Sequence, residues 1–127
     1  LYVRRGNVSN RKVINEDEVE KLLSKYNYEI VDCAKLSVDD QIDKFLFAKN
    51  IVIIHGASIA NLLFVPNNIN VIEIRSNIDG AFSTNLNNNR FNLILFDKTE
   101  KIGEKLRKDI IVNITELENL ILKNNFF

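Results

Sequence analysis

The sequence predicts an α/β domain with a mainly parallel β-sheet and helices on both faces of that sheet. Strand-like and helix-like segments alternate about five times along the 127 residues, a pattern typical of parallel sheets. The strongest strand signal is the β-branched run at residues 51–54, as expected of a strand buried on both faces. A chain of this length buries enough surface to form its own core, so we expect residues 1–127 to form one domain.

Six short segments rich in β-branched and aromatic residues predict the strands. They are residues 1–3, 28–31, 51–54, 71–74, 91–96 and 110–112. The polar stretch 98–109 is expected to form a loop or a hairpin.

The first helix is expected to begin after Asn15, an N-cap residue that forms a capping-box pair with Glu18. Glu16 and Asp17 suit the positive N-terminal end of this helix. The i, i+3, i+4, i+7 spacing predicts one buried face. This face consists of Val19, Leu22, Leu23 and Tyr26.

The second helix is expected to run from Ser37 to near Asn50, and the others to cover residues 57–64, 81–87 and the segment after Thr115, its expected cap. Pro66 ends the helix at 57–64. The expected apolar faces of the second and last helices are Val38, Ile42, Phe45 and Leu46, and Leu117, Leu120 and Ile121, respectively.

Composition excludes several classes of protein. Lys plus Arg and Asp plus Glu each number 17, so no net charge attracts nucleic acid or anionic lipid. No apolar run approaches the roughly 20 residues of a membrane span. One cysteine, Cys33, and one histidine exclude an internal disulfide and the usual zinc site, and four glycines form neither a dinucleotide fingerprint nor a Walker loop. We expect a cytoplasmic protein and, because the sequence begins at Leu1 rather than Met, a piece of a longer chain.

The turn after residues 51–54 is the first candidate site. Gly56 lets a ligand approach the backbone, and the amides of Ala57, Ser58 and Ile59 would face an anion at the N-terminus of a helix. His55 adds a hydrogen-bond donor. In the alternative interpretation, His55 is a strand-end residue bonded to the backbone and Gly56 only eases the turn.

Other polar residues follow or lie within the predicted strands. Arg5 and Arg11 could close a diphosphate site from the other side of this turn, or could be solvated loop charges, as we expect for Arg4. Glu73 could accept a hydrogen bond from a ribose or sugar hydroxyl, although a partly exposed strand end is the favoured interpretation. Asn61 either caps local backbone or contacts the ligand. Cys33 is expected to be a small buried residue.

Several of these segments together resemble the C-terminal half of family 61 glycosyltransferases. The resemblance covers about residues 1–75 and includes an arginine after the first strand, an Asn-Glu helix start and an HGA turn. The matching segments are residues 2–5, Arg11, 13–16, 37–48, 55–64 and 71–74.

The resemblance implies one Rossmann-like lobe of a two-lobe GT-B enzyme, with this chain as the C-terminal lobe that binds the nucleotide-sugar donor. Such enzymes transfer a sugar from a UDP donor to a glycan or protein acceptor, and bacterial relatives serve capsular polysaccharide biosynthesis. The acceptor site and the catalytic base are expected in the other lobe, so the isolated chain should be inactive. No cofactor or metal ion is implied. The alternative is a non-catalytic nucleotide- or protein-binding α/β module.

Carried over by position, the arginine loop and the HGA turn would hold the diphosphate, and Glu16 would support the loop. The expected donor-binding residues are Arg5, Arg11, Glu16, His55, Gly56, Ala57, Ser58 and Asn61. Two positions depart from the family pattern, since Arg4 replaces a serine and Ser58 replaces a glycine.

Overall fold

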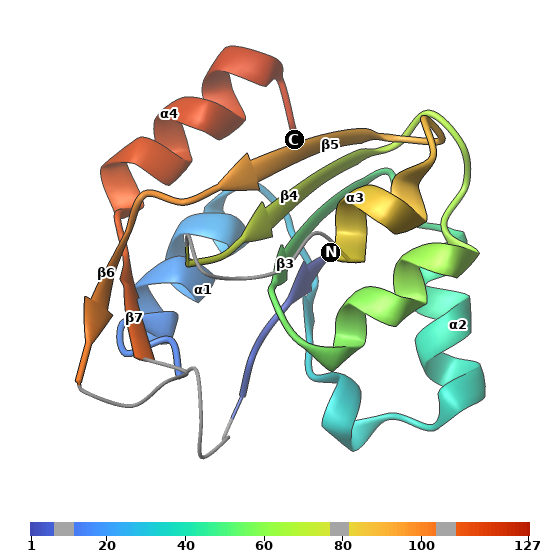
Figure 1. Ribbon diagram of the computed structural model, residues 1–127, viewed down its shortest axis with the longest axis horizontal. Helices are drawn as coiled ribbons and strands as arrows, with labels where there is room; N and C mark the ends of the chain where they lie inside the picture. Colours follow the sequence, from blue (N-terminus) through green and yellow to red (C-terminus); the bar gives the residue numbers. More distant parts are fainter. Residues whose placement is uncertain (7–11, 77–81, 104–108) are drawn as a thin grey trace.

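A computed structural model describes residues 1–6, 12–76, 82–103 and 109–127 of the chain (Figure 1). It confirms the α/β class, because a five-stranded sheet of parallel strands in the order β2-β1-β3-β4-β5 forms the centre of the fold. The strands are β1 (Tyr2–Val3), β2 (Ile30–Val31), β3 (Asn50–Ile54), β4 (Asn70–Ile74) and β5 (Asn92–Phe96).

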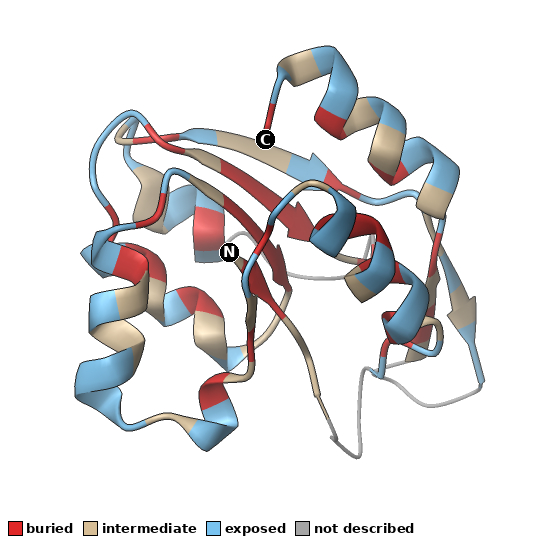
Figure 2. Ribbon diagram, turned by 180° about the vertical axis from the view of Figure 1, so that it is seen from behind, coloured by how far each residue is buried: buried red, intermediate tan, exposed pale blue. Residues whose placement is uncertain are grey.

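Helices cover both faces of the sheet, as expected. On one face lie α1 (Glu16–Lys25) and α4 (Ile114–Asn124), whose apolar side chains pack on Val52, Ile54 and Ile72. The other face carries α2 (Val38–Leu46), the 3-10 helix η2 (Ala57–Phe64) and α3 (Phe82–Asn87). Buried residues concentrate along β1, β3 and β4, whereas the outer sides of the helices are exposed (Figure 2). Among the described residues, no helix is long and apolar enough to cross a membrane.

The strand order fixes where the chain changes direction. β1 lies between β2 and β3, with Tyr2 paired to Ile30 on one side and to Val52 on the other. The chain therefore leaves β1 toward one edge of the sheet and crosses back over it to reach β3. In sheets of this order, a crevice opens beyond the carboxyl ends of the two strands at this switch point.

A hairpin extends the fold beyond the parallel sheet. β6 (Thr99–Ile102) and β7 (Asp109–Val112) pair in antiparallel fashion, which confirms strand structure at 110–112 but places it outside the main sheet. Lys12 and Asp109 tie the hairpin to the segment before α1, since the Lys12 amide donates to Asp109 Oδ1 at 2.9 Å.

One of the predicted helix caps is wrong, and the other is confirmed in position only. Asn15 is the N-cap residue of α1 and its Nδ2 donates to Glu18 Oε2 at 3.1 Å, but its side chain caps no backbone amide of the helix. Its Oδ1 accepts from the Val112 amide and its Nδ2 donates to the Val112 carbonyl, both at 2.9 Å. The side chain thus binds β7 as a neighbouring strand would. For α4, the capping residue is Asn113, whose Oδ1 accepts from the Glu116 amide at 3.1 Å, and Thr115 lies within the helix.

The second helix differs most from its prediction. It ends at Leu46, four residues before Asn50, and of its expected stripe only Phe45 is fully buried, while Val38 and Leu46 are exposed. The reason is that α2 packs against η2 rather than broadly against the sheet. A short contact of this kind buries a narrower face than the apolar spacing suggests.

Candidate functional site

The loop after β1 and the turn after β3 meet at the switch point of the sheet. A Cβ atom placed on Gly56 would lie only 2.6 Å from Nη1 of Arg5, so the Arg5 guanidinium rests against the bare Cα of this turn. Gly56 itself is extended, with φ at 167°, a conformation open to any residue. Glycine is therefore needed here for the close approach of Arg5, and the structure brings these two predicted site residues together.

Glu16 holds the loop after β1 from beneath. Its carboxylate, in a residue only 7% exposed, accepts from the amides of Arg5 at 2.7 Å and Gly6 at 3.2 Å, and from the Tyr2 hydroxyl at 3.1 Å. Burial, reinforced by the charge of Glu16, holds the pKa of Tyr2 well above its ordinary value. Glu16 lies in the first turn of α1, so this helix positions the arginine loop.

Arg4 is not the solvated loop charge that we expected. Its Nε lies 3.0 Å from Glu20 and its Nη2 lies 3.6 Å from Glu16. These two glutamates are one turn apart on α1, so they present carboxylates on the same side of the helix. Arg4 therefore fastens the loop to α1, while Arg5 extends to the turn after β3.

His55 and Glu73 form the second polar pair of the site. Glu73 is 0% exposed, so the favoured prediction of a partly exposed strand end is wrong. Its Oε1 binds Nδ1 of His55 and its Oε2 accepts a hydrogen bond from the Ser83 hydroxyl of α3. The His55 side chain binds another side chain, so the alternative interpretation, in which His55 is bonded only to the backbone, is also wrong.

Strand register explains this pair. Glu73 on β4 lies opposite Ile53 on β3, and His55 follows Ile53 by two residues. Side chains two residues apart share a face of the sheet, so both groups project to the side covered by α3. A lone carboxylate within an apolar strand, one strand away from the only histidine, was a sequence signal for this contact.

Asn61 and Ser58 face the segment after β2. The Asn61 amide donates to Gln41 Oε1 at 2.9 Å and lies 4.0 Å from the Cys33 sulfur. Cys33 is buried, as predicted; burial raises the pKa of its thiol, and a hydrogen bond with Ser58 opposes this rise. Asn61 and Ser58 thus fasten η2 to its neighbours. Their contact with a nucleotide-sugar donor stays a prediction.

The start of η2 offers fewer amides than expected. The Ile59 amide donates to the Gly56 carbonyl at 3.1 Å, so the prediction that it faces an anion is wrong. This bond closes the first turn of a 3-10 helix, in which i→i+3 pairing engages the third amide. Ala57 and Ser58 retain their predicted place at the turn, and Arg11 lies outside the described residues.

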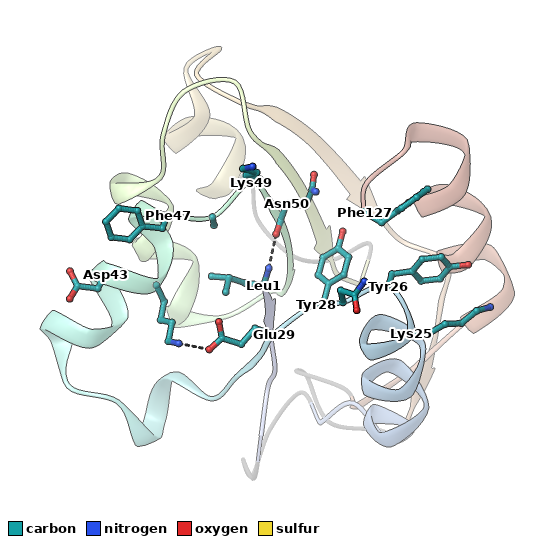
Figure 3. Close-up of a pocket in the computed structure, with 13 residues that line it drawn as sticks. Leu1, Lys25, Tyr26, Tyr28, Glu29, Asp43, Phe47, Lys49, Asn50 and Phe127 are labelled. Atoms are coloured by element: carbon teal, nitrogen blue, oxygen red, sulfur yellow. Dashed lines mark hydrogen bonds and ion pairs between the residues drawn. The ribbon is translucent and has the colours of Figure 1, made fainter.

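A hollow of about 720 Å³ opens at the amino edge of the sheet, where the parallel strands begin, at the other end from the crevice (Figure 3). Aromatic and charged side chains surround it, including Tyr26, Tyr28, Phe47 and Phe127. The Lys44–Glu29 ion pair also lines it. Of the predicted donor-binding residues that the structure describes, none lines this hollow.

A sequence model of glycosyltransferase family 61 matches residues 1–72, which run from β1 into β4. The chain belongs to this family. The match includes Glu16, the arginine loop and the His55–Gly56 turn, and it ends before Glu73 and Ser83. No curated protein matches the chain. Membership implies glycosyl transfer as the class of reaction, with a sugar donor and an acceptor as partners.

Proposed function

We propose that this domain is the donor-binding lobe of a glycosyltransferase that uses a UDP sugar. The diphosphate binds in the crevice beyond the carboxyl ends of β1 and β3. The observation that carries this proposal is the Arg5 guanidinium resting on Gly56 at the switch point. A planar cation at that position can meet two phosphate oxygens at once.

In this proposal the lobe stabilises the leaving group. When the glycosidic bond to the donor breaks, negative charge accumulates on the diphosphate, and positioned donors lower the energy of that state. Arg5 supplies the charge, the amides of Ala57 and Ser58 supply backbone donors, and His55 supplies a side-chain donor. Glu16 acts from outside the crevice because it fixes the backbone that carries Arg5. These groups can neutralise the diphosphate without a metal ion.

The remaining chemistry is assigned to a second lobe. In a two-lobe enzyme of this kind, the acceptor glycan or protein and the catalytic base lie across the cleft from the donor. We therefore expect no transferase turnover from the 127 residues alone. A role in bacterial capsular polysaccharide synthesis is the pathway class that the family resemblance favours.

A UDP titration followed by amide NMR tests the proposal. With half of the cleft supplied by this lobe, we expect a Kd of about 0.1–10 mM, or about 3–5 kcal/mol. The shifts should centre on Gly56, Ala57 and Arg5, and Arg5→Ala should weaken binding at least tenfold, most strongly at low ionic strength.

Lys44→Ala serves as the matched control, because it removes a cation at the other edge of the sheet. GDP, CMP and dTDP in parallel titrations identify the preferred base. Shifts confined to the hollow at the amino edge, with Gly56 and Ala57 unmoved, would falsify the proposed site.

A further inference from the structure

We propose that Glu73 and Ser83 are positioning residues, which orient the His55 ring so that its Nε2 atom meets the donor diphosphate. This inference rests on the proposed function, because it assigns a task within the same crevice. Its basis is the chain of contacts from α3 through β4 to the end of β3, in which Ser83 binds Glu73 and Glu73 binds His55.

The burial of Glu73 is the first argument. A carboxylate without solvent exposure near the carboxyl end of a parallel strand is costly, and an apolar side chain of similar volume would fill the same space. Its neighbours on β4, Ile72 and Ile74, are such side chains. Packing alone therefore explains the carboxylate poorly. Its hydrogen bonds with two polar side chains explain it better, because hydrogen bonds are directional and can orient the His55 ring.

The chemistry of the contact is the second argument. A carboxylate accepts hydrogen bonds, so we assign the Nδ1 proton of His55 to the bond with Glu73. Nδ1 is then committed to the protein interior, and any contact between His55 and a diphosphate uses Nε2. Ser83 donates to the other oxygen of Glu73, which restrains the carboxylate from rotating.

Position is the third argument. His55 directly follows β3, and the next residue, Gly56, lies against the guanidinium of Arg5. The oriented ring therefore stands at the same crevice as the cation assigned to the diphosphate. An imidazole with a fixed tautomer and orientation meets an anion without the entropy loss of ordering a mobile ring.

The first test uses the ligand-free protein. Because the chain has one histidine, ring ¹⁵N signals in NMR spectra report on His55 alone. We expect the Nδ1–H tautomer in the unaltered chain and a shift toward Nε2–H in Glu73→Leu, which removes the acceptor. Glu73→Gln keeps an acceptor oxygen and should retain much of the original state. Glu118→Leu is the control, since Glu118 also binds two side chains, Lys25 and Tyr26, but lies on α4.

The second test measures UDP binding in a double-mutant cycle. Glu73→Leu should weaken UDP binding about tenfold, because the His55 ring loses its partner. Ser83→Ala should weaken UDP binding about two- to threefold, because it only loosens the Glu73 carboxylate. His55→Asn can still donate to Glu73 but lacks the second ring nitrogen. In that background the Glu73→Leu effect should disappear, because Glu73 acts through His55.

The outcomes separate the two proposals. If the unaltered chain binds no UDP, the proposed function fails, while the ring signals still decide whether Glu73 and Ser83 orient His55. If UDP binds but the ring tautomer is the same in Glu73→Leu, or if the two substitutions are additive, the positioning role is overturned. Should Glu73→Leu fail to fold, Ser83→Ala decides both measurements.

Discussion

The carboxyl edge of the sheet, where its parallel strands end, and the amino edge, where they begin, differ in how their carboxylates are held. At the carboxyl edge, Glu16 and Glu73 are buried and each binds several polar groups of the surrounding loops and helices. At the amino edge, Glu29 pairs with Lys44 while their side chains remain 55% and 39% exposed. Glu16 and Glu73 fix the conformation of the backbone and the orientation of the His55 ring, whereas Glu29 makes a surface ion pair with Lys44.

The difference shows why the size of a hollow does not locate this site. The opening at the amino edge is large, yet the charges around it include exposed ion pairs, which contribute little. Buried carboxylates are costly unless several donors compensate them. Glu16 and Glu73 bind Arg5 and His55, which lie in the segments after β1 and β3. Ligands of such folds bind at this switch point, so the two buried carboxylates are the stronger guide.

Glu16→Ala should produce the largest effect on stability. It leaves the amides of Arg5 and Gly6 and the hydroxyl of Tyr2 without their shared acceptor in a part-buried loop. We expect the free energy of unfolding to fall by about 3 kcal/mol, since each unsatisfied buried donor costs about 1–3 kcal/mol. Urea denaturation measures the change.

Glu29→Ala is the matched control at the amino edge and should change the free energy of unfolding by no more than about 0.5 kcal/mol. Equal losses for the two variants would remove the distinction between the edges. UDP affinity should also fall in the folded fraction of Glu16→Ala, because the backbone that carries Arg5 is released.

Gly56→Ala should affect binding more than stability. The added methyl would collide with Arg5 Nη1, the far end of a flexible side chain that can move away. We therefore expect unfolding free energy within about 1 kcal/mol of the original and UDP affinity about tenfold lower, a difference of about 1.4 kcal/mol. Calorimetric melting and an NMR titration measure the two quantities. Unchanged UDP affinity would show that the guanidinium need not rest on this turn.

Much of the sheet could be predicted because both of its faces are buried. β3 and β4 appear as uninterrupted or nearly uninterrupted apolar runs, and the structure extends each by only one residue, Asn50 and Asn70. Helix caps were less predictable because the side chain of Asn15 has a choice of partners. Its partner Val112 is 97 residues away, which no local pattern reveals.

The same distinction applies to the candidate site. The position of His55 and Gly56 at a strand-to-helix turn follows from local sequence, and so does that of Arg5 after the first strand. The Arg5–Gly56 approach and the His55–Glu73 contact depend on strand order and register. An isolated sequence specifies neither, so Glu73 was assigned to the wrong surroundings.

Tyr28→Phe tests a buried polar contact at the amino edge. The Tyr28 hydroxyl donates to the Phe126 carbonyl, and its loss should cost about 1 kcal/mol near neutral pH. The removed hydroxyl is buried but neutral, so the loss of stability should be smaller than for the buried carboxylate in Glu16→Ala. It should be larger than for the exposed carboxylate in Glu29→Ala. Urea denaturation at pH 7 provides the measurement, and UDP affinity should be unaffected.

The same variant predicts a pH effect. Burial raises the pKa of Tyr28 to about 12 from an ordinary 10.0, so the folded state retains the phenol proton more tightly than the unfolded state. Stability from this group is complete below pH 10 and is lost as the pH rises toward 12. Tyr28→Phe should reduce this loss, and a remainder should persist because burial also raises the pKa of Tyr2. An identical decline between pH 10 and 12 in both proteins would contradict the assignment.

Lys44→Ala should have the smallest effect. Its ion pair with Glu29 joins two partly exposed side chains, so water and salt screen the attraction and ordering both chains offsets much of the remainder. We expect a loss of no more than about 0.5 kcal/mol at low ionic strength, smaller still in 1 M NaCl, and UDP affinity within twofold of the original. Denaturation at the two salt concentrations and the UDP titration measure these quantities. A tenfold loss of UDP affinity would instead assign donor binding to the hollow at the amino edge, where Lys44 would be the cation that meets the phosphates.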